Sequence, residues 1–172
     1  DEAILGAIEE TAVLTSWPAP MEEAFMEAFD ALERSDLLLL HRLVGFLEEQ
    51  GAPPEVVEGV YQRILKTCPG ELAALRGYAR FLFQQGRFAE LAEVTEEEAA
   101  LAKEAPRRSA LWLRAAELWQ DIPEEGDRAI QALEEARAAV GTAPAIDRTL
   151  SRLYRIVGNW RPLAESLRRV AG

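Results

Sequence analysis

The chain is poor in the residues that metal centres and disulfide frameworks need. Its 172 residues include one cysteine, Cys68, and one histidine, His41. A single cysteine excludes an internal disulfide and a cysteine-rich zinc site, and a single histidine excludes a multi-histidine metal site. A ferritin-type di-iron bundle needs Glu-x-x-His pairs, whereas Leu38 precedes His41 at that spacing. We therefore expect no metal and no cofactor.

Basic residues are also few, with 19 Lys and Arg against 30 Asp and Glu and a net charge of −11. Because a phosphate backbone requires a basic surface, a nucleic-acid partner is disfavoured. The longest purely aliphatic run is Leu37–Leu40, far short of a membrane-spanning helix, so we expect no membrane insertion. No basic signal-peptide region opens the chain, and we expect a cytoplasmic location.

Helix-forming residues dominate what is present. Ala (29) and Leu (23) outweigh Val, Ile and Thr together (22), which favours an all-α fold without strands. Apolar residues recur at three- and four-residue steps between Gly and Pro breakers, as amphipathic helices require. The clearest series are Leu37, Leu40, Val44, Leu47; Leu72, Leu75, Tyr78, Leu82; Leu111, Ala115, Leu118, Trp119; and Ile146, Leu150, Leu153, Tyr154, Val157.

The breakers are regularly spaced. Ser35, Pro69, Pro106 and Pro144 are 34, 37 and 38 residues apart, and Gly51 lies inside the first interval as Gly86 lies inside the second. Asp36 predicts a helix N-cap, and Pro54 followed by Glu55 suits a first helical turn. Self-similarity at this period indicates stacked helical hairpins.

These intervals resemble tetratricopeptide repeats (TPRs), 34-residue helix–turn–helix units with a loose pattern of large and small residues. The turn glycine followed two residues later by an aromatic occurs twice, in Gly86-Arg87-Phe88 and Gly158-Asn159-Trp160. The large and small positions of the helices are matched by Leu75, Tyr78, Ala79 and Leu82; by Trp112, Ala115, Ala116 and Trp119; by Ala129, Leu133 and Ala136; by Leu150, Ser151 and Tyr154; and by Val57, Tyr61 and Ile64.

The resemblance implies an all-α fold, a right-handed α-solenoid of about five helix–turn–helix repeats. We expect one TPR-like domain over 1–172, with repeats at 35–69, 70–105, 106–143 and 144–172 and a degenerate repeat at 1–34. The longer intervals require insertions, for example Asp121 to Gly126 in place of a short turn. A plain helical bundle is the alternative, since it has the same apolar stripes.

No catalytic arrangement is visible, so we expect no catalytic residues and no enzyme. The phosphate-binding patterns G-x-G-x-x-G and G-x-x-x-x-G-K-[ST] do not occur. The acidic run Glu96-Glu97-Glu98 points around a helix rather than to one side, and we interpret it as a solvated face. The tryptophans are expected to fill the core, and Cys68 to be a small half-buried residue.

Charge is unevenly distributed along the chain. Residues 1–69 carry a net charge of −10, residues 70–105 carry −3, and residues 106–172 carry +2. Such asymmetry can orient a partner and accelerate its arrival.

Two stripes of side chains have the spacing of one helix face, and the resemblance places them on the first helices, which line the peptide-binding groove of this family. The candidate groove residues are Arg76, Arg80 and Phe83, then Arg148, Arg152 and Arg155, with His41 and Glu117 at equivalent positions of other units. The alternative is that these arginines are solvated or paired with nearby acids such as Asp147 and Glu117.

The resemblance therefore implies a non-catalytic protein–protein interaction scaffold that binds a partner protein or peptide, acidic where it meets the arginines. The alternatives are a structural self-assembly module and a regulatory helical domain of a larger protein. The last unit has an apolar stripe of Leu163, Leu167 and Val170, while Ile146, Leu150 and Leu153 also need cover. An apolar patch is expected to remain exposed in this segment, and two expectations are open: the natural chain continues and covers it, or it mediates self-association through the C-terminal end.

Overall fold

The computed structural model describes residues 37–141, 143–159, 162–164 and 167–168. These residues form α-helices joined by turns, and they contain no strand. The chain divides into two compact units, Asp1–Ala74 and Leu75–Gly172. Residues 1–34, Asp36 and Val170 lie outside the described part, and with them the degenerate repeat and the expected N-cap.

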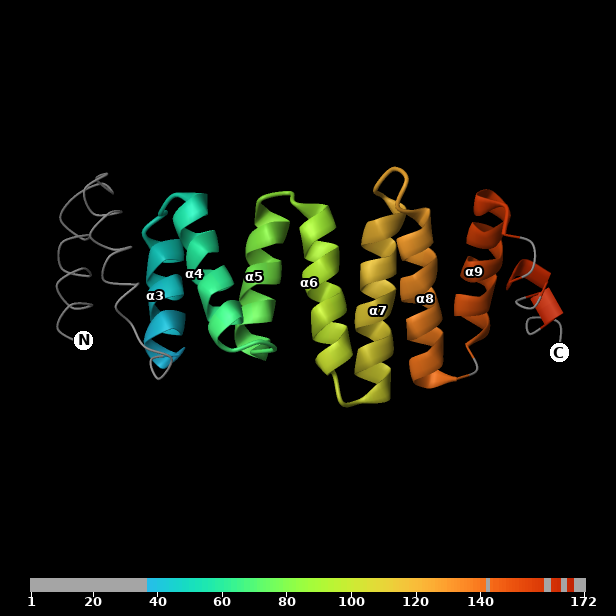
Figure 1. Cartoon of the computed structure of the whole chain (residues 1–172), viewed down its shortest axis with the longest axis horizontal. Helices are drawn as coiled ribbons and strands as arrows, with labels where there is room; N and C mark the ends of the chain where they lie inside the picture. The colour runs from blue at the N-terminus through green and yellow to red at the C-terminus, as the bar shows by residue number, and fades with distance from the viewer. Residues whose placement is uncertain (1–36, 142, 160–161, 165–166, 169–172) are drawn as a thin grey trace. The chain divides into compact units, whose positions relative to one another are not determined.

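The first unit contains the hairpin of α3 (Leu37–Glu49) and α4 (Pro54–Thr67), which lie side by side in Figure 1. Pro54 starts α4 and Glu55 lies in its first turn, as predicted. The N–H that proline lacks would have no partner within the helix at this position, and an acid is favourable near the helix N-terminus. The facing side chains Leu47, Val60, Tyr61 and Ile64 are at most 1% exposed. The Tyr61 hydroxyl also donates a 2.8 Å hydrogen bond to Glu48.

The turn between α3 and α4 depends on Gly51, whose φ of +66° lies in the left-handed region. We expect Gly51→Ala to lower the free energy of unfolding by about 1 kcal/mol, because a Cβ disfavours this backbone conformation. Thermal or denaturant unfolding measures the change. Gly45→Ala is the control, since Gly45 is helical with no atom near an added Cβ, and this change is expected to stabilise by up to about 1 kcal/mol. Equal effects at the two positions would contradict the assigned turn.

The second unit contains most of α5 (Leu72–Gln84), then α6 (Phe88–Leu101), α7 (Ala105–Gln120), α8 (Gly126–Val140) and α9 (Pro144–Val157). The helices follow one another as neighbours of alternating direction (Figure 1). α7 packs against both α6 and α8, and α8 packs against α9. An inner helix of this unit therefore has two covered sides.

Small residues allow the helices of the second unit to approach closely. Six alanines, each 0% exposed, surround the nearly buried Trp119 and Tyr154 and the fully buried Leu150: Ala92, Ala115, Ala116, Ala129, Ala132 and Ala136. Close packing of small against large side chains excludes water from the interface. Most of these alanines were predicted from the repeat pattern, and their burial agrees with it.

The helices end and begin at the Gly and Pro residues that the sequence predicted as breakers. Gly86 and Gly158 have φ values of +69° and +78°, and Pro106 and Pro144 lie in the first turns of α7 and α9. The segment 121–125 replaces a short turn between α7 and α8, as the longer interval predicted. The predicted fold class, an all-α architecture of helices joined by turns, is confirmed in the described residues.

Candidate functional site

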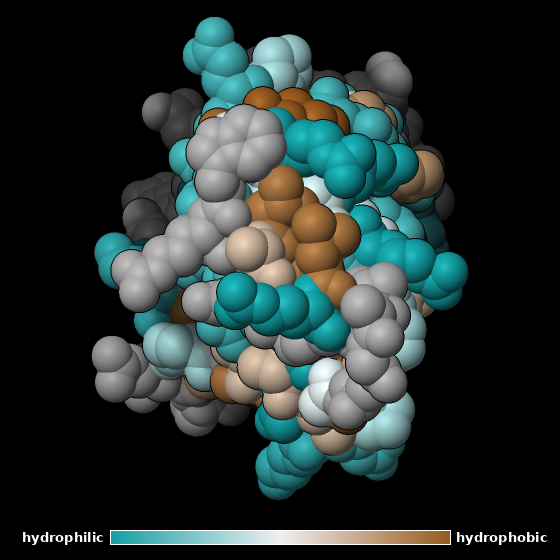
Figure 2. All heavy atoms as spheres, turned by 90° about the vertical axis from the view of Figure 1, so that its right-hand side faces the viewer, coloured by the Kyte–Doolittle hydropathy of each residue, from teal (hydrophilic) through white to brown (hydrophobic). Residues whose placement is uncertain are grey.

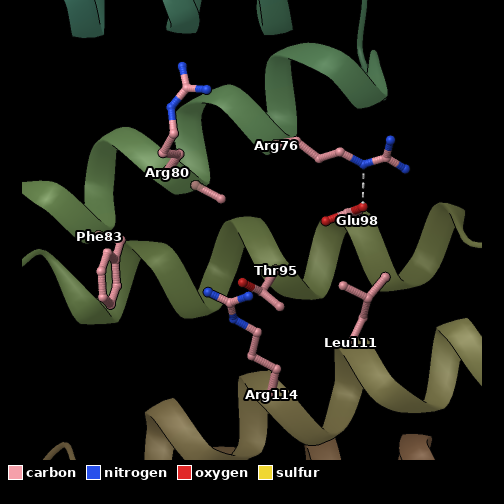
Figure 3. A pocket seen from close by; sticks show the side chains of 8 residues that line it. Arg76, Arg80, Phe83, Thr95, Glu98, Leu111 and Arg114 are labelled. Atoms are coloured by element: carbon pink, nitrogen blue, oxygen red, sulfur yellow. Dashed lines mark hydrogen bonds and ion pairs between the residues drawn. The ribbon is translucent and has the colours of Figure 1, made fainter.

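A pocket of about 320 Å³ opens on the second unit, where α5, α6 and α7 contribute side chains (Figure 3). Three arginines and one glutamate lie among its lining residues: Arg76, Ala79, Arg80, Phe83, Thr95, Glu98, Leu111 and Arg114. Three of the predicted groove residues, Arg76, Arg80 and Phe83, therefore meet at one site. The helical spacing of α5 brings them there, since they lie four and three residues apart.

Glu98 organises one side of this pocket. Its side chain is 11% exposed, and it accepts a 2.7 Å hydrogen bond from Nε of Arg76 and a 3.0 Å bond from Arg107. The dashed line in Figure 3 marks the bond from Arg76. A buried carboxylate needs such partners, because an unpaired charge away from water is costly. Arg76 is thus held in place while its side chain remains 47% exposed.

Arg114 lies on the opposite side of the pocket. Figure 3 shows its side chain extending from α7 toward Thr95 on α6. The Thr95 hydroxyl is already used, since it donates to the carbonyl oxygen of Leu91 at 2.6 Å. Arg114 is exposed and forms no hydrogen bond or ion pair with any residue that the structure describes. Its guanidinium N–H groups can therefore donate hydrogen bonds to an anionic group.

Phe83 adds an apolar element beside the arginines. It is 58% exposed and makes an edge-to-face contact with Phe88, which is itself 46% exposed. Exposed aromatic side chains next to arginine are typical of residues that contribute strongly to protein–protein binding. The pocket thus combines a positively charged wall with an apolar margin.

Arg114 and Leu111 were not among the predicted groove residues. The prediction took the same register position on every first helix, which gave Glu117 on α7. A pocket between two helices is lined by opposite flanks of those helices, so α7 contributes different positions from α5. Glu117 is exposed on α7 and does not line this pocket. The three-residue spacing of Leu111 and Arg114 is the signal that could have identified this flank.

The interpretation of Glu96-Glu97-Glu98 as a solvated face is wrong for two of the three residues. Glu98 is buried and accepts hydrogen bonds from two arginines, and Glu96 accepts a 2.6 Å hydrogen bond from Nε1 of Trp119. Only Glu97 is exposed. The reason is that side chains of neighbouring helices reach these carboxylates: Arg76 of α5 and Arg107 of α7 bind Glu98, and Trp119 of α7 binds Glu96.

Glu96 belongs to a polar network that joins α6, α7 and α8. Arg128 donates to Glu93 at 2.9 Å and to Glu96 at 3.1 Å, and its guanidinium carbon lies 3.7 Å from the centre of the Trp119 ring. Burial opposes the charged form, but the hydrogen bonds and charges of Glu93 and Glu96 raise the pKa of Arg128 above its ordinary value. Arg128 therefore stays charged and stabilises the packing of Trp119.

The second predicted stripe, on α9, lies apart from the pocket. Arg148, Arg152 and Arg155 are exposed. Arg148 donates to the carbonyl oxygen of Pro144 in its own helix at 3.3 Å, and Arg152 donates to Gln120 on α7 at 3.4 Å. Asp147, suggested as a partner for these arginines, instead lies 3.3 Å from Arg137 on α8.

His41 and Cys68 lie in the first unit. Nε2 of His41 is 3.0 Å from a carboxylate oxygen of Glu71, without the geometry of a hydrogen bond to any described residue. Cys68 is a free, half-buried thiol. Within 37–141 and the shorter described segments that follow, three or more His, Cys, Asp or Glu side chains never gather as a metal site would require. None of the helices in the described part is long and apolar enough to span a bilayer.

No protein-family model and no curated protein matches the chain. Several solved structures are similar at low sequence identity. A double mutant of MamA from RS-1 is 16% identical with a TM-score of 0.45, over 96% of this chain and 89% of that one. PilF of Pseudomonas aeruginosa is 16% identical with a TM-score of 0.43, over 99% of this chain and 76% of that one. MamA of Desulfovibrio magneticus RS-1, from its residue 41 onward, is 17% identical with a TM-score of 0.43, over 96% and 90%.

Proposed function

We propose that this chain is a non-catalytic protein-interaction scaffold that binds an acidic segment of a partner protein at the pocket of α5, α6 and α7. The observation that carries the proposal is the charge of this pocket. Three guanidinium groups and one carboxylate line it, although the chain as a whole has a net charge of −11. A local positive site on an acidic protein selects acidic ligands over basic ones.

The contacts of the pocket residues suggest separate roles. Glu98 already neutralises part of the charge of Arg76, so Arg76 serves mainly to shape the wall. Arg114 has an exposed guanidinium group that can form a bidentate bond with a carboxylate. Phe83 can cover an apolar side chain next to that carboxylate. The expected ligand is thus a peptide segment with an Asp or Glu close to an apolar residue.

The test uses a phage-displayed library of random linear peptides, selected on the intact chain. We expect enrichment of peptides rich in Asp and Glu. Arg80→Glu combined with Arg114→Glu should weaken the binding of the selected peptides at least about tenfold, equivalent to about 1.4 kcal/mol. Rising salt should also weaken wild-type binding, because the contact is electrostatic and exposed. Titration by fluorescence anisotropy measures both effects.

The matched control carries the same change of charge at another place. Lys66→Glu with Arg148→Glu alters two exposed basic residues that lie outside the pocket. This variant should bind the selected peptides within about twofold of wild type, because a change of charge outside the contact acts mainly through screened long-range forces. Circular dichroism should show that both variants retain their helices. Equal loss in both variants, or selection of peptides without acidic residues, would refute the pocket as the binding site.

A further inference from the structure

The C-terminal side of the second unit carries an apolar patch among hydrophilic side chains (Figure 2). The large apolar side chains exposed in this part of the chain are Ile156 (73%), Val157 (44%) and Leu167 (44%). The expected exposure of Ile146, Leu150 and Leu153 is wrong, since these residues are 6%, 0% and 8% exposed. They are covered because α8 packs against α9 and Leu163, at 6% exposure, joins the same core.

Arginines accompany the exposed apolar residues. Arg155 precedes Ile156, Arg152 lies one helical turn before Ile156, and Arg168 follows Leu167. All three are exposed. The segment 144–172 contains six arginines and two acidic residues, a net charge of +4. A ligand for this face should therefore offer apolar side chains together with negative charge.

The chain itself contains a segment with that chemistry. Residues 1–36 contain ten acidic residues and one arginine, a net charge of −9. Within this segment, Met21, Phe25, Phe29 and Leu32 follow one another at four- and three-residue steps, with Glu22, Glu23 and Glu27 between them. This sequence pattern combines apolar residues at helical spacing with negative charge. It complements the C-terminal face in both hydrophobicity and charge.

We propose that the C-terminal face, centred on Ile156, Val157 and Leu167, binds the acidic N-terminal segment of a second copy of this chain. The contact is heterologous, because the two surfaces that meet are different. Each copy then keeps one unused surface of each kind, and association continues beyond a dimer. This surface is distinct from the arginine pocket of α5, α6 and α7.

The overall charge of −11 opposes association at long range. At about 0.15 M salt the screening length is about 8 Å, so this repulsion is largely removed while pairs in direct contact persist. Light scattering of the full chain at this salt concentration should show a mass that rises with concentration from the 19.1 kDa of one copy. The rise should not stop at twice that value.

Two charge-reversed variants test the pairing. Variant one carries Arg152→Glu, Arg155→Glu and Arg168→Glu; variant two carries Glu22→Lys, Glu23→Lys and Glu27→Lys. Each alone should associate at least about tenfold more weakly than wild type, because like charges then face each other. Mixed in equal amounts, they should recover association, since the reversed surfaces complement one another. Circular dichroism of each variant before mixing verifies its helical content.

A second comparison tests the apolar part. Ile156→Ser with Leu167→Ser should weaken association, while Leu38→Ser, at a residue of α3 that is 82% exposed, should leave it unchanged. A wild-type chain that stays monomeric at millimolar concentration would overturn the proposal. A mass that saturates at the dimer, or variants whose mixture does not recover association, would overturn it as well.

Discussion

Trp119→Ala is expected to lower the free energy of unfolding by about 3–5 kcal/mol, the usual cost of removing a buried aromatic side chain. The Trp119 side chain is 1% exposed and lies among alanines of α7 and α8 that leave no room for the helices to move closer. Its loss opens a cavity and removes the N–H group that donates a 2.6 Å hydrogen bond to Glu96. Denaturant unfolding followed by circular dichroism measures the change.

A second variant at Trp119 separates packing from hydrogen bonding, and a variant of an exposed aromatic residue is the control. Trp119→Phe retains much of the ring but not the N–H group, so it should cost about 1.5–3 kcal/mol, the range for a lost hydrogen bond to a charged group. Phe83→Ala removes an aromatic ring that is 58% exposed and should change stability by less than about 1 kcal/mol. If Trp119→Ala were as mild as Phe83→Ala, the assigned core of the second unit would be wrong.

Arg137→Met is expected to lower the free energy of unfolding by about 1.5–3 kcal/mol, the range for a hydrogen bond to a charged group. Arg137 lies in the last turn of α8, and Asp147 in the first turn of α9, at 3.3 Å. Both positions are favourable to the helix dipoles. Because the Asp147 side chain is 5% exposed, losing Arg137 leaves a buried carboxylate with less compensation. Chemical denaturation of purified wild type and variant gives the difference.

A double-mutant cycle verifies the coupling. Asp147→Asn combined with Arg137→Met should lower the free energy of unfolding by less than the sum of the two single changes. Each single change leaves the partner's charge uncompensated, and the double change removes both charges. Arg148→Met is the surface control, because Arg148 is exposed and bonds within its own helix. It should change stability by no more than about 0.5 kcal/mol. Additive effects at 137 and 147 would show that the two residues do not interact.

The helices and turns of the described part could be predicted well from local pattern. The predicted first turn of α4 at Pro54, the turn glycines Gly86 and Gly158 and the long connection after α7 all occur where expected. These features depend on apolar periodicity and on the backbone preferences of Gly and Pro, which act over a few neighbouring residues. The site could be predicted only in part: Arg76, Arg80 and Phe83 on α5 were identified, and Arg114 on α7 was not.

Local pattern in the amino-acid sequence is therefore sufficient for the helical class, the Gly and Pro turns and most of the small residues of the core. Tertiary packing decided which polar side chains are buried and which pair with one another. Glu98 was predicted to be solvated but is buried in the packed structure. Asp147 pairs with Arg137 of α8 rather than with an arginine of its own helix. The physical reason is that burial and pairing depend on how neighbouring helices are rotated and how long their connections are. Apolar spacing within one helix carries no information on either.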